Sequence, residues 1–379
     1  MIFASALFIV SILLIMYHFI GYFILLKMLT AFSKEEVIEV AKEELPFFSV
    51  IITAHNEERT IRRKIENTLS LDYPSDRFEV ILADDWSKDG TVSAVKDFIL
   101  EGRIRYFKPD KHMGKTYAQN GAVRETSGDI IAFSDANSYW ETDVLRRFAN
   151  SFQDTRVGFV AGALRYTEME ETATGQSQGF YWNYELQVRL LESKFLSIVT
   201  SNGAIYAIRR SIYFDADPLY SHDSFMPPYI VSLGKKAVFD SDIVAHEKSI
   251  KSARKEFSRK VRMFGRMYKF IFDKRQREII RRTGSSYRFM YFSHRTLRFL
   301  LPILSVLAIA SLLTLLYFCL PLNAMLVGLI IAGLSVLAIR KLRIIVFSYS
   351  LAIAAMIVGF NNYITGKIRP YWEPVDDGR

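Results

Sequence analysis

The stretch FFSVIITAHNEE, residues 47–58, has the pattern of a buried β-strand that ends abruptly in polar side chains. A continuous apolar run of this kind suits a strand that is covered on both faces of a sheet. Two later stretches follow the same plan: FEVILADD at 78–85 ends in two acids, and DIIAFSDAN at 129–137 ends in Asp135 and Asn137. Segments with helical spacing lie between these strands. The alternation predicts an α/β fold with a parallel sheet.

The polar ends of these three strands form a candidate site. Ligands of such sheets bind beyond the carboxyl ends of the strands. Two acids after a single strand are more often a cap, but three polar ends at one edge indicate a site. Acids are tolerated side by side around a divalent cation. Asp135 and Asn137 offer the hard oxygen ligands that suit Mg²⁺ or Mn²⁺ bridging a diphosphate.

The charge balance narrows the class of ligand. The 379-residue chain carries a net charge of +9, which fits a phosphate-bearing ligand, an anionic lipid surface or nucleic acid. Its single cysteine, Cys319, excludes an intramolecular disulfide. The glycine spacing of a Walker-type phosphate loop does not occur in the sequence, which argues against an ATPase of that class.

Long uncharged segments predict membrane helices at both ends of the chain. Spanning a bilayer takes roughly 20 apolar residues. Residues 2–26, 299–320 and 321–339 satisfy this length, whereas 344–360 is shorter and contains Ser348, so it either spans or lies in the interface. Basic residues follow the first run and separate the third from the fourth. This distribution predicts a multi-pass protein of the cell membrane whose central segment faces the cytoplasm.

A strongly basic segment joins the central part to the later membrane helices. Residues 248–298 contain 17 Lys or Arg and 3 Asp or Glu, and apolar residues recur from Phe257 to Ile271 at helical spacing. The pattern predicts an amphipathic helix with a cationic face that lies on anionic membrane lipids. Nucleic acid is the rival ligand, but the adjacent membrane helices disfavour it.

Four motifs, taken in order, resemble those of family 2 glycosyltransferases: VIITAHNEE, VILADDWSKDGT, HMGKTYAQNGA and FSDANSYW. The resemblance continues through SNGAIYAIRRS into the membrane segments. It implies a GT-A fold, which is a Rossmann-like mixed α/β sheet with flanking helices. It also implies inverting sugar transfer from a nucleotide-diphosphate sugar, with a UDP-sugar as the expected donor. The membrane helices resemble those of the branch that builds cellulose-, chitin- and hyaluronan-like polysaccharides.

The resemblance also implies roles for individual residues. For the donor nucleotide it indicates Thr53, His55, Glu57, Asp85, Lys115 and Asp135, with His55 stacking on the base and Asp85 accepting from a ring N–H. For the metal it indicates Asp135 and Asn137, with His246 either a third ligand or an ordinary strand-end residue.

The catalytic residues follow from two further motifs. Asp223 in SHDSFMPPY is the expected base, which takes the proton of the acceptor hydroxyl. His222 replaces an acidic neighbour and either tunes Asp223 or lies at the surface. RKVRM resembles the family's Q-x-x-R-W motif, which gives Arg259 and Arg262 catalytic roles at the leaving diphosphate and puts Met263 at the Trp position.

The expected organisation has four parts: a transmembrane helix at 1–30, a cytoplasmic GT-A domain at 33–247, basic interface helices at 248–296, and two or three transmembrane helices at 297–365. The expected function is extension of a polysaccharide. One alternative is transfer of a single sugar to a lipid-linked acceptor, and another is a nucleotide-sugar sensor or scaffold without catalysis. A homo-oligomer or an export partner would supply further helices if a polymer channel is needed.

Overall fold

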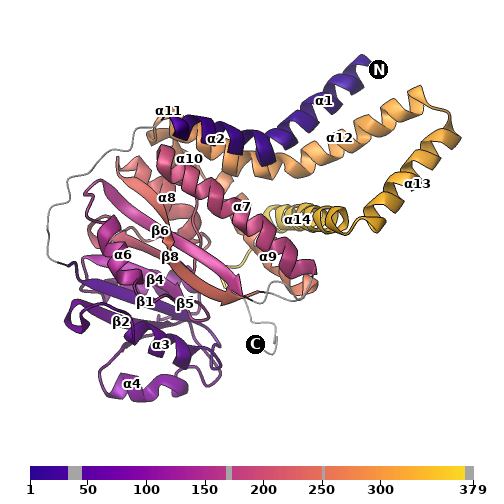
Figure 1. Ribbon diagram of the computed structural model, residues 1–379. Coiled ribbons are helices and arrows are strands. Elements are labelled where there is room, and N and C mark those ends of the chain that lie inside the picture. Colours follow the sequence, from indigo (N-terminus) through magenta and orange to yellow (C-terminus); the bar gives the residue numbers. More distant parts are fainter. Residues whose placement is uncertain (33–44, 168–172, 250–251, 372–379) are drawn as a thin grey trace.

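A mixed eight-stranded sheet forms the centre of the molecule (Figure 1). The computed structural model describes residues 1–32, 45–167, 173–249 and 252–371. Within these residues the strand order is β3-β2-β1-β4-β7-β6-β8-β5. The strands are β1 Phe48–Ala54, β2 Phe78–Asp84, β3 Arg105–Phe107, β4 Ile130–Asp135, β5 Tyr139–Trp140, β6 Val157–Thr167, β7 Ile205–Arg209 and β8 Lys236–Lys248.

The parallel arrangement predicted from the sequence holds for the first four strands, and among the later strands for the pair β6–β8. β1 pairs in parallel with β2 and β4, and β2 pairs in parallel with β3. β7 runs antiparallel to both β4 and β6. The chain enters β7 at the carboxyl edge of the sheet, where Ile205 lies opposite Ser134, so β7 must run back along β4. The sheet is therefore mixed, as the GT-A resemblance implies.

Helices cover both faces of the sheet, which explains why β1 is apolar throughout. Val50 and Ile52 pack in the cluster beneath α3 (Ile61–Leu69) and α6 (Val144–Ser151). Ile51 packs on the opposite face beneath α5 (Lys115–Arg124) and α8 (His222–Ser232). Every residue of β1 is buried, as a central strand requires.

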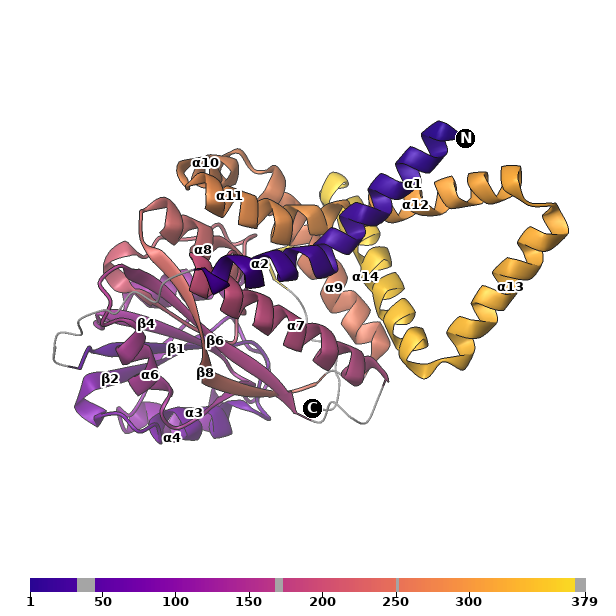
Figure 2. The ribbon, with the colours of Figure 1, turned by 45° about the horizontal axis from the view of Figure 1, so that its top comes forward.

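Within the described parts of the chain, three helical segments are long and apolar enough to cross a membrane: Ile2–Ala31, Ser285–Cys319 and Leu342–Ile364. The first two contain the helices α1 (Ile2–Met16), α2 (Tyr22–Ala31), α11 (Ser285–Tyr291) and α12 (Leu297–Cys319), with π-helical turns at Tyr17–Gly21 and Phe292–Thr296; the third lies in α14 (Arg340–Ile364). Helices α1, α12 and α13 project away from the sheet (Figures 1 and 2).

The third and fourth apolar runs differ from their expected lengths. The run at 321–339 forms α13 (Leu322–Ala338), a shorter apolar helix, while the fourth run belongs to the longer α14. The fourth run continues as a helix through its polar residues because the Tyr349 hydroxyl hydrogen-bonds Ser305 of α12 at 2.6 Å. A polar side chain that finds a partner in a neighbouring helix does not end a membrane helix.

The predicted amphipathic helix is present as α9 (Ala253–Phe272), followed by α10 (Lys274–Arg282). Its apolar stripe does not lie open for lipid. Phe264 and Tyr268 pack instead in one cluster with Phe299 of α12 and Met356 of α14. Gly265 and Gly359 allow the close approach of α9 and α14, since a Cβ at Gly359 would lie 2.9 Å from the Gly265 nitrogen. The candidate membrane helices α12 and α14 thus cover the apolar face of α9.

Candidate active site

The register of the parallel strands brings the predicted polar ends to one level. Thr53 of β1 lies beside Ala83 of β2 and beside Asp135 of β4. Asp85 follows β2 by one residue, and its backbone N–H donates to the Ala54 carbonyl at 2.9 Å. The convergence of three strand ends at one edge is therefore confirmed.

Two buried polar atoms at this edge have no hydrogen-bond partner. They are the Thr53 hydroxyl Oγ1 and the Asp85 carboxylate Oδ1, and they belong to neighbouring strand ends. Buried polar groups are almost always hydrogen-bonded, because leaving one without a partner costs about 1–3 kcal/mol. Such atoms on adjoining strand ends indicate a place where a ligand supplies the missing bonds.

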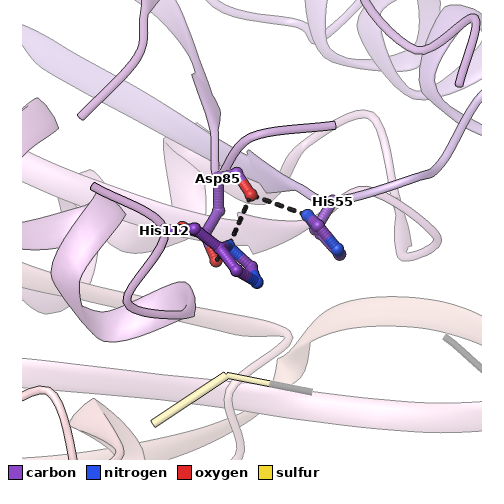
Figure 3. Close-up of side chains that lie close together, drawn as sticks. All are labelled: His55, Asp85 and His112. Atoms are coloured by element: carbon purple, nitrogen blue, oxygen red, sulfur yellow. Dashed lines mark hydrogen bonds and ion pairs between the residues drawn. The ribbon is translucent and has the colours of Figure 1, made fainter. Parts of the chain in front are cut away.

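His55, Asp85 and His112 form a tight cluster beside these atoms (Figure 3). The Nδ1 atoms of His55 and His112 lie 2.6 Å and 2.9 Å from the Asp85 carbonyl oxygen. A carbonyl only accepts, so both Nδ1 atoms donate. The two imidazole rings stack with their centroids 4.6 Å apart. Together they form a flat platform next to a buried carboxylate.

The charge state of Asp85 reflects this burial. Burial raises the pKa of Asp85 above its usual range, and His112 at 3.1 Å from Oδ2 opposes the rise. The ligand atoms of the cluster lie within 4.8 Å of one another, so it offers a possible metal site. An ion bound through the Nδ1 atoms would displace their protons from the Asp85 carbonyl. His112 was not assigned a role from the sequence, although it opens the motif HMGK.

The metal ligands predicted from the sequence lie on β4, the turn after it, and β8. The Lys115 ammonium contacts the Asp135 carboxylate and donates to the Gly203 carbonyl at 2.8 Å. The Asn137 amide donates to Glu247 Oε1 at 3.1 Å. Glu247, an acid that sequence reasoning missed, adds a second carboxylate to this edge.

His246 and Glu57 have other contacts within the chain. His246 lies opposite Tyr139 in the β5–β8 pair, and its Nε2 is 3.2 Å from Glu141 Oε1. Glu57 lies in the turn before α3, where its carboxylate accepts from the Thr60 hydroxyl at 2.7 Å. Asp84 ties down the turn after β2, since its Oδ1 accepts from the Ser87 backbone N–H at 3.0 Å.

Asp223 lies in the first turn of α8, and a buried histidine anchors it. His222 donates from Nε2 to Asn120 Oδ1 at 3.1 Å and accepts at Nδ1 from the Tyr206 hydroxyl at 2.8 Å. Burial lowers the pKa of His222 to about 3, with a smaller contribution from Lys115. The surface alternative for His222 is therefore wrong, and this neutral side chain is part of the core. The Ser201 backbone N–H holds the Asp223 carbonyl at 2.9 Å.

The arginines of α9 differ in their surroundings. Arg259 makes two hydrogen bonds to the buried Glu256 carboxylate, at 2.9 Å and 3.0 Å. Burial and the nearby charges of Arg266 and Arg259 lower the pKa of Arg262 to about 10. Met263, at the position expected for Trp, is 41% exposed. Arg266, one turn beyond Arg262, was not considered from the sequence.

A protein-family model matches the part of the chain that contains these strand ends. Residues 49–215 match the family model described as glycosyl transferase family 2. The chain carries a glycosyl transferase family 2 domain. The matched residues include the strand ends, the His55–Asp85–His112 cluster and the Lys115–Asp135 pair.

Curated relatives of this glycosyltransferase domain share it over less than half of the chain. The probable glycosyltransferase YdaM of Bacillus subtilis is 31% identical over 189 residues, which are 45% of this chain and 42% of YdaM. The beta-monoglucosyldiacylglycerol synthase of Trichormus variabilis is 27% identical over 168 residues, which are 44% of this chain and 34% of the synthase. This chain therefore spans less than half the length of these two relatives.

A solved structure extends the likeness to almost the whole chain. The mannosyltransferase PcManGT from Pyrobaculum calidifontis, in complex with GDP-Man and Mn²⁺, has a TM-score of 0.71. The alignment covers 95% of this chain and 99% of that protein, at 23% sequence identity. The likeness shows that this chain has the fold of that protein, with a GT-A type of domain and similar helices around it.

Proposed function

We propose that the protein is a membrane-bound, inverting glycosyltransferase that moves a sugar from a nucleotide-diphosphate sugar to an acceptor at the membrane. The observation that carries the proposal is the pair of buried atoms without a partner, Thr53 Oγ1 and Asp85 Oδ1, at the same sheet edge as Lys115 and Asp135. The basic residues that flank the apolar helices support a cell membrane protein with this domain in the cytoplasm.

The nucleoside would lie on the platform of His55 and His112. A base that stacks there can donate a ring N–H to the Asp85 carboxylate. Uracil and guanine both carry such a donor. A UDP-sugar is the donor implied by the sequence motifs, and GDP-mannose is the one bound by PcManGT.

The donor diphosphate would lie between the start of α5 and α9. Asp135, Asn137 and Glu247 supply oxygen atoms, which fit Mg²⁺ or Mn²⁺, and His246 neighbours Glu247 on β8. When bound, a divalent ion neutralises charge on the leaving diphosphate. Lys115 and Arg262 add fixed positive charge, which stabilises the charge that develops on the leaving group.

Asp223 would be the base. In an inverting transfer a single carboxylate removes the proton of the acceptor hydroxyl on the face of the sugar opposite the leaving group. The buried His222 and the Ser201 backbone N–H position α8, which leaves the Asp223 carboxylate to act on the acceptor. Arg259 contributes by organising α9 through its bonds to Glu256.

A lipid-linked acceptor that receives one sugar is the substrate we favour. One curated relative is named for a diacylglycerol product, and Met263 lacks the flat ring on which a sugar chain would stack. Extension of a polysaccharide is the second candidate, because candidate membrane spans flank the catalytic domain on both sides in sequence. The length of the product separates the two.

The test uses the full chain, purified in detergent with Mn²⁺ or Mg²⁺ and a panel of UDP- and GDP-sugars with lipid extracts as acceptors. We expect release of nucleoside diphosphate and one glycosylated lipid product. Asp223→Asn should abolish transfer and leave donor binding within about twofold, because the carboxylate acts on the acceptor. Transfer that persists in this variant refutes the assignment of the base. Nucleotide binding without turnover on any donor or acceptor would favour the sensor.

A further inference from the structure

The chain that leaves α14 returns to the catalytic domain and crosses the candidate donor site. We name residues 366–371 the strap. Gly366, at φ 66°, ends the helix, and Lys367 donates its backbone N–H to the Asn362 carbonyl at 2.9 Å, which turns the chain back. The part of the chain drawn in yellow in Figure 3 passes below the His55–Asp85–His112 cluster.

Three contacts fix the strap on the site. The Tyr371 ring lies against the His112 ring, with the centroids 4.7 Å apart and the planes tilted by 44°, next to the stacked pair of His55 and His112. The Pro370 carbonyl accepts a hydrogen bond from the Arg266 guanidinium. The same carbonyl lies against Gly114, where a Cβ would overlap it. An aromatic ring thus lies on the platform proposed for the base, and an oxygen atom lies at the start of α5.

The charge around Arg266 explains why an oxygen atom is held there. Its Nε is buried without a hydrogen-bond partner, and Arg262 lies one turn away on α9. Burial lowers the pKa of Arg266, and the charge of Asp223 opposes this. A neutral carbonyl compensates a guanidinium weakly, whereas a phosphate oxygen makes a charge-assisted bond. The surroundings of Arg266 therefore favour an anion over the Pro370 carbonyl.

Arg266 lies close to the start of α5, beside which the diphosphate of the proposed donor would pass. Pro370 joins Arg266 to Gly114, and the next residue, Lys115, holds Asp135. A diphosphate linked to a base on the His112 platform and to a metal at Asp135 would pass the start of α5. That path is the one that the strap now covers.

We propose that Arg266 is a further diphosphate-binding residue of the donor site, and that the strap occupies its place and that of the base when no donor is bound. This inference rests on the proposed function, because it requires a nucleoside diphosphate at this site. Donor binding then exchanges the Pro370 carbonyl for a phosphate oxygen and the Tyr371 ring for the base. The strap is a competitor that is part of the chain.

The test measures binding of UDP and GDP, each with Mn²⁺, to four detergent-purified proteins: wild type, a chain ended after Lys367, Arg266→Gln, and the combination. Removing the strap should tighten the nucleoside diphosphate by roughly tenfold, because a bound competitor is lost. Arg266→Gln should weaken it by roughly tenfold or more, the loss expected for a charge-assisted bond. The effects should not add, since both changes act on one contact.

Two further variants are controls. One tests whether truncation acts by disturbing the fold, and the other tests whether any lost positive charge on α9 weakens binding. Tyr371→Ala keeps the chain length and should tighten binding in the same direction as removal of the strap. Arg254→Gln changes an exposed arginine at the far end of α9 and should leave binding unchanged. Unphosphorylated uridine or guanosine should bind the truncated chain with and without Arg266→Gln equally, because without the strap only the diphosphate reaches Arg266.

Limited proteolysis reports on the strap directly. Trypsin cuts the exposed Lys367–Ile368 bond, and the bond after Arg369 resists because Pro370 follows. Nucleoside diphosphate should speed this cut severalfold by displacing the strap. Protection by nucleotide, or weaker binding after removal of the strap, would overturn the competitor and show a lid that closes over the donor.

The outcomes separate this inference from the proposed function. Normal turnover with unchanged nucleotide affinity in the truncated chain and in Arg266→Gln refutes the inference alone. Failure of all four proteins to bind either nucleotide refutes both. Binding by the truncated chain but not by wild type is the strongest support for the strap as a competitor.

Discussion

Lys64 lies buried beneath the candidate site with no hydrogen bond to its ammonium, and replacing it should stabilise the protein. The side chain is fully buried in α3, and its Nζ lies 4.5 Å from the centre of the Trp140 ring. A buried polar group without a partner costs about 1–3 kcal/mol. Lys64→Met keeps the length of the side chain and removes the amine, so the free energy of unfolding should rise by about that amount at pH 7.

The pH dependence of this gain tests its cause. Burial lowers the pKa of Lys64 well below its usual range, and Asp135 opposes the shift. The folded state therefore binds fewer protons than the unfolded state, so the stability of the wild type rises with pH until the unfolded lysine also loses its proton. The gain from Lys64→Met should therefore shrink between pH 7 and pH 10.

The assay is thermal unfolding of both proteins in one detergent, at pH 7, 8, 9 and 10. We expect the unfolding midpoint of Lys64→Met to lie roughly 1–4 °C higher at pH 7. Lys96→Met is the matched control, since Lys96 is exposed on α4 (Lys96–Leu100) and its loss should change stability by less than about 0.5 kcal/mol. A lower midpoint for Lys64→Met, with weaker Mn²⁺ binding, would show a charged lysine that stabilises Asp135 and would refute the reasoning.

Three other predictions concern the site. Asp85→Asn should weaken UDP or GDP binding by roughly tenfold to a hundredfold. Wild-type affinity should also fall at acid pH, because the Asp85 carboxylate, whose pKa is raised, becomes protonated as the pH decreases. The affinity of Asp85→Asn should not change over the same range. Titration calorimetry measures both. Asn137→Asp should lower the Mn²⁺ concentration that gives half-maximal turnover, and an unchanged requirement would mean that residue 137 does not contact the ion. Arg259→Gln should lower the unfolding midpoint and change kcat little, because buried Glu256 loses a partner. A hundredfold loss of kcat at a constant unfolding midpoint would instead show that Arg259 is catalytic.

The strand ends could be predicted from the sequence because their cause is local. An apolar run followed by polar residues specifies where a strand ends, and parallel pairing then sets Thr53 and Asp135 side by side. The order of the later strands could not be predicted in this way. The direction of β7 depends on the edge of the sheet at which the preceding loop ends. Contacts such as that between Lys115 and the Gly203 carbonyl fix this position.

Residues that reach the site from distant segments escaped the sequence pattern for the same reason. His112 and Glu247 belong to stretches in which the family resemblance was recognised, and Arg266 follows the motif RKVRM by three residues. Nothing local shows which side chain is turned toward Asp85, Asn137 or Asp223. The pairing of Arg259 with Glu256 is different, because the two are three residues apart on one helix. Residues at this spacing on a helix are expected to form an ion pair. The pair could therefore have been predicted from the sequence, although the overall positive charge of the segment does not reveal it.

The donor-free site compensates its own charges, and this decides how a donor must bind. The chain supplies a partner to almost every group proposed to hold the donor: Asp135 to Lys115, Glu247 to Asn137, His112 to Asp85 and the Pro370 carbonyl to Arg266. Leaving these groups buried and unpaired would cost more than the fold can offset. A donor therefore gains affinity mainly by exchanging partners, while Thr53 Oγ1, Asp85 Oδ1 and Arg266 Nε can gain a bond they lacked. Because a neutral carbonyl and a ring are weaker partners than a diphosphate and a base, the exchange favours the donor while keeping the empty site folded.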